Sequence, residues 1–142
     1  MADQEQLSTQ DVIAVAEFRS ALRHFLRRSE KIARRSGLTP QRYTLLMMIK
    51  GSRDGTEQST VTELADRLQL AQSTVTELVR RAESAGLIER EQSQRDARVA
   101  HLRLTAEGDR RLMLSFTALE QEREQLREAF SALEGGAVGV AG

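Results

Sequence analysis

The segment VTELADRLQL (61–70), AQSTVTELVRRAESAGLIERE (71–91), SQRDARV (93–99) and AHLRLT (100–105) decides the predicted fold of this 142-residue chain. The spacing of its apolar residues predicts a helix, a tight turn, a second helix, a strand, a charged loop and a returning strand. That order of elements is typical of a winged helix-turn-helix, in which the second helix and the loop between the strands are both exposed.

The two helices of this segment have recognisable beginnings. Thr60 and Glu63 match a capping box, in which each side chain bonds the backbone N–H of the other residue. A helix is therefore predicted from there to about residue 68. After a three-residue turn, the second helix is predicted over about 72–84. Ala71 offers no side-chain oxygen to cap it, which leaves its start open.

Two antiparallel strands are predicted after the helices, over 87–91 and 99–104, with the loop 92–98 between them. In the second strand, alternate residues share one apolar face, which is the period of a half-buried strand. One register also places opposite charges or hydrogen-bonding partners across the ladder. The pairs in that register are Glu89 with Arg103 and Glu91 with His101.

Helices are also predicted on both sides of this segment. The first covers about 11–36. The next covers 40–50, with Thr39 as its N-cap and Pro40 at its first position. The last covers 105–133, and the small side chains of GGAVGVAG (135–142) are expected to fray.

The predicted fold class is mainly α with a small antiparallel β-hairpin, and the whole chain, 1–142, is expected to be one domain. Within it, 39–104 forms the winged helix-turn-helix lobe. The long terminal helices, 11–36 and 105–133, are predicted to serve dimerisation.

Composition narrows the possible classes of protein. The chain is 39% hydrophobic and 30% charged, which is typical of a soluble globular domain. It has no Cys, which excludes disulfides and thiolate metal ligands. Its 21 basic and 21 acidic residues argue against a general polyanion binder. The polar N-terminus and the absence of a bilayer-length apolar run favour a cytoplasmic location, with no membrane contact.

Both terminal helices carry apolar residues at heptad spacing, with Arg123 between two of them on the last helix. Each Leu or Phe left in water is unfavourable by roughly 1.5–3 kcal/mol, so a second identical chain is expected to cover these seams. The alternative is a monomer whose two helices pack only on each other. The predicted dimerisation residues are Val15, Phe18, Leu22, Leu112, Phe116, Leu119, Leu126, Phe130 and Leu133.

One face of the helix over 72–84 is suited to the major groove of DNA. Val75, Leu78, Val79 and Ala82 lie on its core side, and polar residues occupy the opposite side. Short polar side chains near a helix N-terminus can meet base edges, and an arginine can pair with guanine or phosphate. An ordinary solvated helix face is the alternative. The candidate DNA-binding residues here are Gln72, Ser73, Thr74, Thr76, Glu77, Arg80 and Arg81.

The loop between the strands carries Arg95, Asp96 and Arg98. Guanidinium groups at a hairpin tip suit the minor groove, where narrow A·T-rich segments concentrate negative potential. We expect Arg98 to enter the groove and Asp96 to hold its guanidinium in one orientation. A solvated charged turn is the alternative.

The sequence resembles the MarR family of bacterial transcription regulators, over about residues 11–133. DARVAHLRLTAEG is similar to the wing of that family, and LADRLQLAQSTVTELVRRAESAGLIER to its helix-turn-helix. The resemblance implies a homodimer that acts as a repressor, or less often an activator, on a pseudo-palindromic operator. It also implies relief of DNA binding by a small aromatic or phenolic ligand. Glu77 stands where many relatives carry a basic residue, and the absence of Cys removes the thiol oxidation that some relatives use.

An effector pocket is expected where the terminal helices meet the DNA-binding lobe. The alternative, which the residue types favour, is that its candidate residues are core and interface side chains with solvated arginine neighbours. The candidate residues are Phe18, His24, Arg28, Arg42, Tyr43 and Met47. A winged-helix module that binds proteins instead of DNA is the alternative function. Only two histidines occur, and no nucleophile, zinc or phosphate-loop motif is found, so neither an enzyme nor a cofactor or metal site is predicted.

Overall fold

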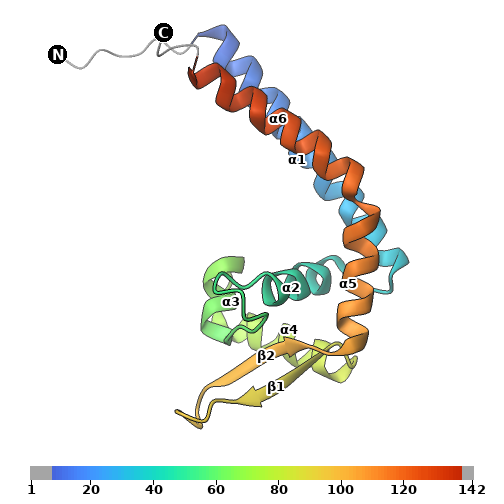
Figure 1. The fold of residues 1–142 in the computed structure, drawn as a ribbon, viewed down its shortest axis with the longest axis vertical. Helices are drawn as coiled ribbons and strands as arrows, with labels where there is room; N and C mark the ends of the chain where they lie inside the picture. Colours follow the sequence, from blue (N-terminus) through green and yellow to red (C-terminus); the bar gives the residue numbers. More distant parts are fainter. Residues whose placement is uncertain (1–7, 139–142) are drawn as a thin grey trace, which may run out of the picture. The chain divides into compact units, whose positions relative to one another are not determined.

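The computed structural model describes residues 8–138, which form two compact units (Figure 1). The winged unit comprises Ile32–Thr117. The helix-pair unit comprises the residues up to Lys31 together with those from Ala118. The elements of each unit are given below in chain order.

The winged unit contains the predicted helix-turn-helix and hairpin. Its elements are the last turn of α1 (Thr9–Arg35), α2 (Pro40–Lys50), α3 (Val61–Leu68), α4 (Gln72–Ser84), β1 (Ile88–Gln92), β2 (Ala100–Leu104) and α5 (Ala106–Ala118). The strands pair antiparallel, with Glu89 opposite Arg103 and Glu91 opposite His101, as the sequence predicted. The fold class is therefore confirmed: mainly helical, with one two-stranded antiparallel sheet in the described residues.

Local sequence signals set the ends of the helices. The hydroxyl of Thr39 accepts a hydrogen bond from the Arg42 N–H at 3.2 Å, and that of Thr60 accepts one from the Glu63 N–H at 3.2 Å. Helix α3 ends at Leu68, and the next residue, Gln69, has a left-handed φ of 55° that turns the chain toward α4. Ala71 precedes α4 without a side-chain cap, as its chemistry requires.

The core of the winged unit is built from one face of each helix and the inner face of the hairpin. Helix α4 buries Val75, Val79 and Ala82 completely. Leu78 was predicted to join them, but it is half-buried and lines a shallow hollow with Leu68 and Leu70. Each fully buried Leu or Val contributes roughly 1.5–3 kcal/mol relative to exposure. The largest side chains in this core are Leu38, Leu45, Leu46, Ile49, Leu64, Leu87 and Leu102.

The loop between α2 and α3 is bonded to two other elements of the winged unit. Ser59 forms a β-bridge with Leu102, with the Ser59 N–H bonding the Leu102 carbonyl at 3.0 Å and the Leu102 N–H bonding the Ser59 carbonyl at 2.8 Å. At the other end of the loop, the Arg67 side chain donates to the carbonyls of Met48 and Gly51 at the end of α2. The loop is therefore tied to the hairpin and to α3.

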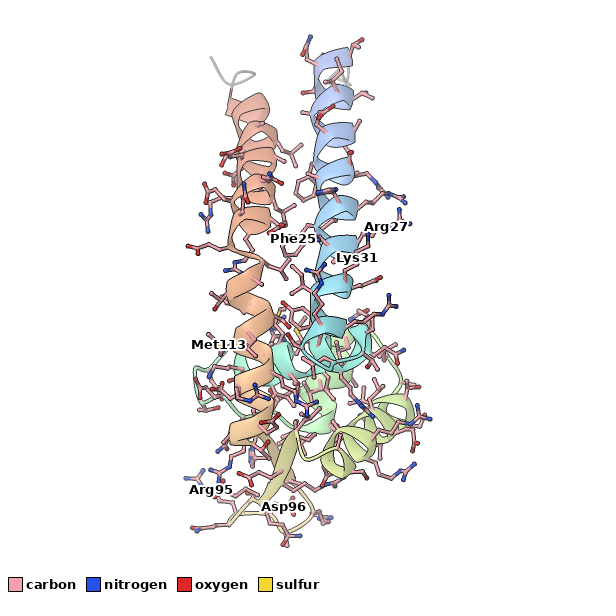
Figure 2. All side chains as sticks on the ribbon, turned by 90° about the vertical axis from the view of Figure 1, so that its right-hand side faces the viewer. Phe25, Arg27, Lys31, Arg95, Asp96 and Met113 are labelled. Carbon is pink, nitrogen blue, oxygen red and sulfur yellow. The ribbon has the colours of Figure 1, made fainter. Side chains whose placement is uncertain are left out.

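The helix-pair unit consists of most of α1 and of α6 (Glu120–Val138), which lie side by side in both views (Figures 1 and 2). Arg28 Nε lies 3.3 Å from Glu122 Oε1, and the rings of Phe18 and Phe130 have centroids 6.0 Å apart. These contacts are antiparallel, since the earlier residue on α1 meets the later residue on α6.

The single long helix predicted over 105–133 is wrong in two respects. It is interrupted at Leu119, which separates α5 from α6, and α6 continues to Val138. No Gly or Pro occurs between residues 109 and 134, so the usual sequence signals for a break are missing. The helix also includes the first half of the expected fraying tail, and residues 139–142 lie outside the described part of the chain.

Among the described residues, no helix is both long and apolar enough to cross a membrane.

Gly108 lies at the joint between α4, β1 and α5. The hydroxyl of Thr105 donates to the Gly86 carbonyl at 2.6 Å, and the Thr105 N–H bonds the Leu87 carbonyl at 3.0 Å. Helix α5 therefore begins directly against the chain that leaves α4. A Cβ at Gly108 would lie 2.0 Å from the Leu87 carbonyl oxygen, so only glycine permits this approach.

We expect Gly108→Ala to lower the free energy of unfolding by about 2–3 kcal/mol, because the added methyl forces two backbone segments apart. Gly135→Ala is the matched control, since its Cβ meets nothing within 4 Å on α6 and alanine favours a helix by up to ~1 kcal/mol. Urea unfolding followed by circular dichroism measures both. Equal stabilities of the two variants would contradict the close packing at this joint.

Candidate nucleic-acid interface

The outer face of α4 carries most of the residues that the sequence singled out. Gln72, Ser73, Thr74 and Thr76 are exposed, while Val75 faces the core between them. The Thr76 hydroxyl bonds the Gln72 carbonyl at 2.9 Å, which fixes the hydroxyl against its own helix. The first two turns of α4 therefore present short polar side chains outward, as a base-reading surface requires.

The next turn of α4 carries a three-residue charge cluster, which we call the α4 clamp: Glu77, Arg80 and Arg81. Glu77 Oε2 accepts from Arg80 Nε at 3.0 Å, and Glu77 Oε1 accepts from Arg80 Nη2 at 2.6 Å. Arg81 Nε bonds the same Oε1 at 3.1 Å. The side chains of both arginines are more than half exposed. The sequence analysis named Glu77, Arg80 and Arg81 only as separate candidate DNA-binding residues. It missed this pairing, although the spacings of three and four residues along a helix could have indicated it.

The α4 clamp also changes the acidity of Glu77. Its hydrogen bonds from Arg80, and then the charge of that arginine and of Arg81, lower the pKa of Glu77 to about 2. The carboxylate therefore stays ionised at neutral pH and the cluster keeps a net charge of one cation.

The tip of the β1–β2 hairpin is the second exposed element. The Ser93 hydroxyl accepts from the N–H groups of Arg95 and Asp96 at 3.2 and 3.3 Å, and the Val99 N–H bonds the Asp96 carbonyl at 3.0 Å. Local side-chain bonds of this kind define the turn. Figure 2 shows Arg95 and Asp96 at this tip. The sequence analysis did not include Ser93 in the site. Its position two residues before Arg95, at the start of the loop, could have indicated this turn.

Asp96 holds Arg98 as predicted. Its Oδ1 accepts from the Arg98 N–H at 3.0 Å and from Arg98 Nε at 3.3 Å. The Arg98 side chain is nonetheless 91% exposed, so its remaining N–H donors point to solvent. The hairpin therefore offers an oriented guanidinium at an open position, and a narrow anionic groove is the chemical environment that suits it.

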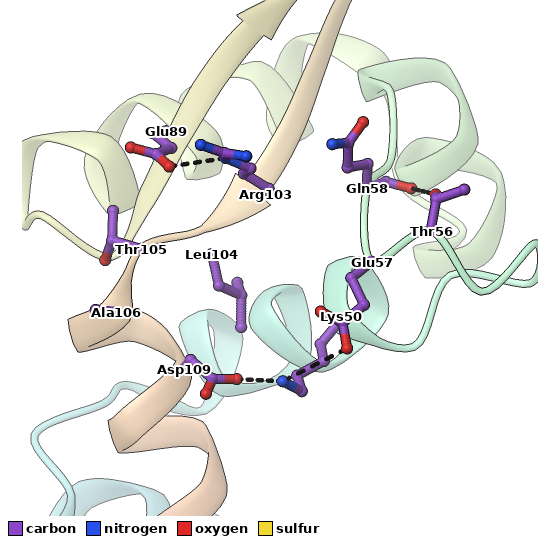
Figure 3. A pocket seen from close by; sticks show the side chains of 10 residues that line it. All are labelled: Lys50, Thr56, Glu57, Gln58, Glu89, Arg103, Leu104, Thr105, Ala106 and Asp109. Atoms are coloured by element: carbon purple, nitrogen blue, oxygen red, sulfur yellow. Dashed lines mark hydrogen bonds and ion pairs between the residues drawn. The ribbon is translucent and has the colours of Figure 1, made fainter.

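A pocket of about 420 Å³ lies elsewhere in the winged unit, between the loop after α2, strand β2 and the start of α5 (Figure 3). Lys50 bonds Asp109 there and lies 3.6 Å from Glu57, and the bond to Asp109 raises the pKa of Lys50. Arg103 is paired with Glu89 at 2.8 Å. Both cations are thus balanced by carboxylates within the pocket, and it contains none of the residues predicted to bind DNA or an effector.

The six residues predicted to bind an effector divide between the two units. Phe18, His24 and Arg28 belong to the helix-pair unit, while Arg42, Tyr43 and Met47 lie on α2 of the winged unit. Tyr43 is buried, and Arg28 is paired with Glu122. The effector pocket stays a prediction. Within the described residues, no group of three His, Cys, Asp or Glu side chains is placed to hold a metal ion.

Comparisons with known proteins agree on the type of fold. Residues 36–99 match the model of the MarR family. The structure is similar to that of a mutant MarR from E. coli complexed with operator DNA, with a TM-score of 0.67, 19% identity, and coverage of 86% of this chain and 89% of the other.

Two further solved structures are similar. A mutant MepR from S. aureus bound to an oligodeoxyribonucleotide gives a TM-score of 0.63 at 19% identity, covering 87% of this chain and 92% of the other. A transcriptional regulator from Thermotoga maritima gives 0.60 at 26% identity, covering 87% and 83%. A comparison with curated proteins found no match.

We expect the carboxyl group of Glu77 to titrate near pH 2, well below its ordinary value of 4.5, because two arginines stabilise its ionised form. A lowered folded-state pKa contributes stability that is full above pH 4.5 and is lost as the pH falls toward 2. Carbon-detected NMR titration of the Glu77 carboxyl measures this directly. In the double variant Arg80→Gln, Arg81→Gln, the midpoint should rise toward 4.5, and an unchanged midpoint would contradict the pairing.

Proposed function

Because residues 36–99 match the model of the MarR family, we propose that this chain is a DNA-binding transcription regulator that acts as a homodimer. The observation that carries the proposal is the exposed Arg98, held by Asp96 on the same compact unit that presents the polar face of α4. A helix of this kind fits the major groove and a guanidinium at a hairpin tip fits the minor groove. The solved DNA complexes of similar fold support this reading. Such a protein acts in the compartment that holds the DNA, the cytoplasm.

Exposed apolar side chains on the helix-pair unit support the homodimer. Val12, Val15 and Leu26 are 59%, 45% and 50% exposed on α1, and Phe130 is 46% exposed on α6. Several large apolar side chains exposed on one pair of helices are typical of an interaction site. Of the nine predicted dimerisation residues, Leu112 and Leu119 are buried within the single chain, so a partner would cover the others.

We further propose that the regulator is a repressor on a pseudo-palindromic operator, relieved by a small aromatic or phenolic ligand. A two-fold dimer matches a palindromic site, since each subunit reads one half. On the helix-pair unit, Phe18, Phe25, Leu126 and Phe130 line an open hollow of about 390 Å³ beside two arginines. Aromatic walls with a cationic edge suit a ligand of this class, and Phe18 is one of the predicted effector residues.

A winged-helix module that binds a protein is the second candidate. The observation that favours it is the α4 clamp, in which Glu77 offsets the charge of one arginine on the face that would meet DNA. The formal net charge of zero agrees with it. Failure to bind any duplex, with stable capture of a protein partner, would favour this alternative.

We expect Arg98→Ala to weaken DNA binding at least tenfold, because it removes the exposed guanidinium of each hairpin. Fluorescence anisotropy with duplexes selected from genomic DNA by the unaltered protein measures the loss. Arg110→Ala is the matched control, since Arg110 is exposed on α5 and pairs with Glu107. Affinity should also fall steeply with salt, as counterions are released. Unchanged affinity of the Arg98 variant would refute its role.

We expect Val15→Glu to shift the protein from dimer to monomer, because it places a charge within the exposed apolar surface of α1. Ser20→Glu adds the same charge at an exposed position five residues further along α1, on a different side of the helix, and should leave the dimer intact. Sedimentation velocity across a concentration series measures both. A dimer that survives Val15→Glu and Ser20→Glu alike would place the interface elsewhere.

A further inference from the structure

The α4 clamp leaves one edge of the Arg80 guanidinium free. An arginine side chain has five N–H donors in a planar fork. Glu77 uses the side edge, since it accepts from Nε and from one hydrogen of Nη2. One hydrogen of Nη1 and the second hydrogen of Nη2 form the end edge, which Glu77 does not touch. That end edge is the pair of donors that meets O6 and N7 of guanine in the major groove.

The side-edge contact also fixes the direction of this free edge. Two hydrogen bonds to one carboxylate hold a planar group far more strictly than one bond does. The Arg80 side chain is 65% exposed on the outer face of α4, so the held fork projects away from the core. Ordering it before binding reduces the side-chain entropy that recognition would otherwise cost.

The negative charge of Glu77 disfavours the binding of DNA phosphates by Arg80 and Arg81. A phosphate group approaching Arg80 or Arg81 meets a carboxylate that already occupies one side of each guanidinium. Like charges in that position repel, whereas a guanine edge offers neutral acceptors and carries no such penalty. The low pKa of Glu77, about 2, keeps this repulsion present at any physiological pH.

We propose that Glu77 is a positioning residue that makes Arg80 a reader of guanine in the major groove and prevents it from serving as a general phosphate anchor. This inference rests on the proposed DNA-binding function and adds a base preference to it. Each half of the bound site then contains a guanine beneath the third turn of α4. Arg81 shares the carboxylate through a single bond and is therefore held less strictly.

The test begins with a duplex selected by the unaltered protein from a random-sequence pool. Guanines in each half-site are then replaced one at a time by 7-deazaguanine, which lacks the N7 acceptor. For the unaltered protein, at least one replacement should weaken binding about tenfold, as expected for half of a good bidentate contact. Glu77→Gln should reduce that loss below about threefold.

The same variant should bind a guanine-free poly(dA-dT) duplex more tightly than the unaltered protein does. The slope of log affinity against log salt concentration should increase in magnitude by about one to two, because the freed arginine of each subunit gains a phosphate contact. Arg80→Lys should abolish the 7-deazaguanine loss and keep the salt slope, since lysine retains the charge but has no fork.

Glu83→Gln is the matched control. Glu83 lies on the last turn of the same helix and is likewise paired with an arginine, Arg90, at 2.7 Å. It should behave as the unaltered protein in both assays, and thermal unfolding of every variant checks that α4 remains folded. If Glu77 had only a structural role, Glu77→Gln would lower the melting temperature and leave the 7-deazaguanine loss and the salt slope unchanged.

The outcomes separate this inference from the proposed function. If the unaltered protein selects a duplex and Glu77→Gln changes neither the 7-deazaguanine loss nor the salt slope, the inference is overturned and the DNA-binding function stands. If no replacement of guanine matters, Arg80 reads no guanine and the inference again fails. If no duplex is selected at all, both fail together.

Discussion

The close approach of α5 to the chain leaving α4 is the constraint on which the winged unit depends. Gly108 has no Cβ, so the first turn of α5 can lie against the Leu87 carbonyl, and Thr105 bonds the backbone on the same side. Strand β1 begins one residue after Leu87, and β2 ends one residue before Thr105. One joint therefore fixes the base of the hairpin against the end of α4, and with it the two exposed elements that the proposed function requires.

The exposed arginines of this protein are paired with carboxylates and do not form a patch of excess positive charge. The chain has no net charge, and Arg80 and Arg81 on the α4 face and Arg98 at the hairpin tip each have a carboxylate beside them. An arginine held in this way loses some general attraction for phosphate and gains a defined direction for its remaining donors. Base recognition needs direction, whereas non-specific binding needs only charge. The proposed regulator would accordingly bind DNA weakly in general and depend on a few oriented contacts.

The helix-pair unit leaves apolar side chains exposed that a second chain could cover. Its apolar side chains are covered only in part within one chain, and Val15, Leu26 and Phe130 remain about half exposed. The proposed dimer would cover them and bring two winged units to one duplex, which a single subunit cannot do. An effector that enters the aromatic hollow beside Phe18 and Phe130 would then act on the same helices that are proposed to join the subunits.

The features that depend only on neighbouring residues could be predicted from the sequence. The caps at Thr39 and Thr60, the strand register that pairs Glu89 with Arg103, and the Asp96–Arg98 contact all follow from local chemistry and spacing. The tertiary structure alone decided what depends on residues distant in the chain. Nothing near Leu119 predicts that the last helix breaks there, Ser59 joins the hairpin only because Leu102 lies beside it, and the need for glycine at 108 comes from a carbonyl 21 positions earlier. A local sequence pattern indicates the hydrogen bonds that a residue can make with its neighbours in the chain. Burial of a side chain, and the close approach of two distant backbone segments, depend on the packing of the whole fold.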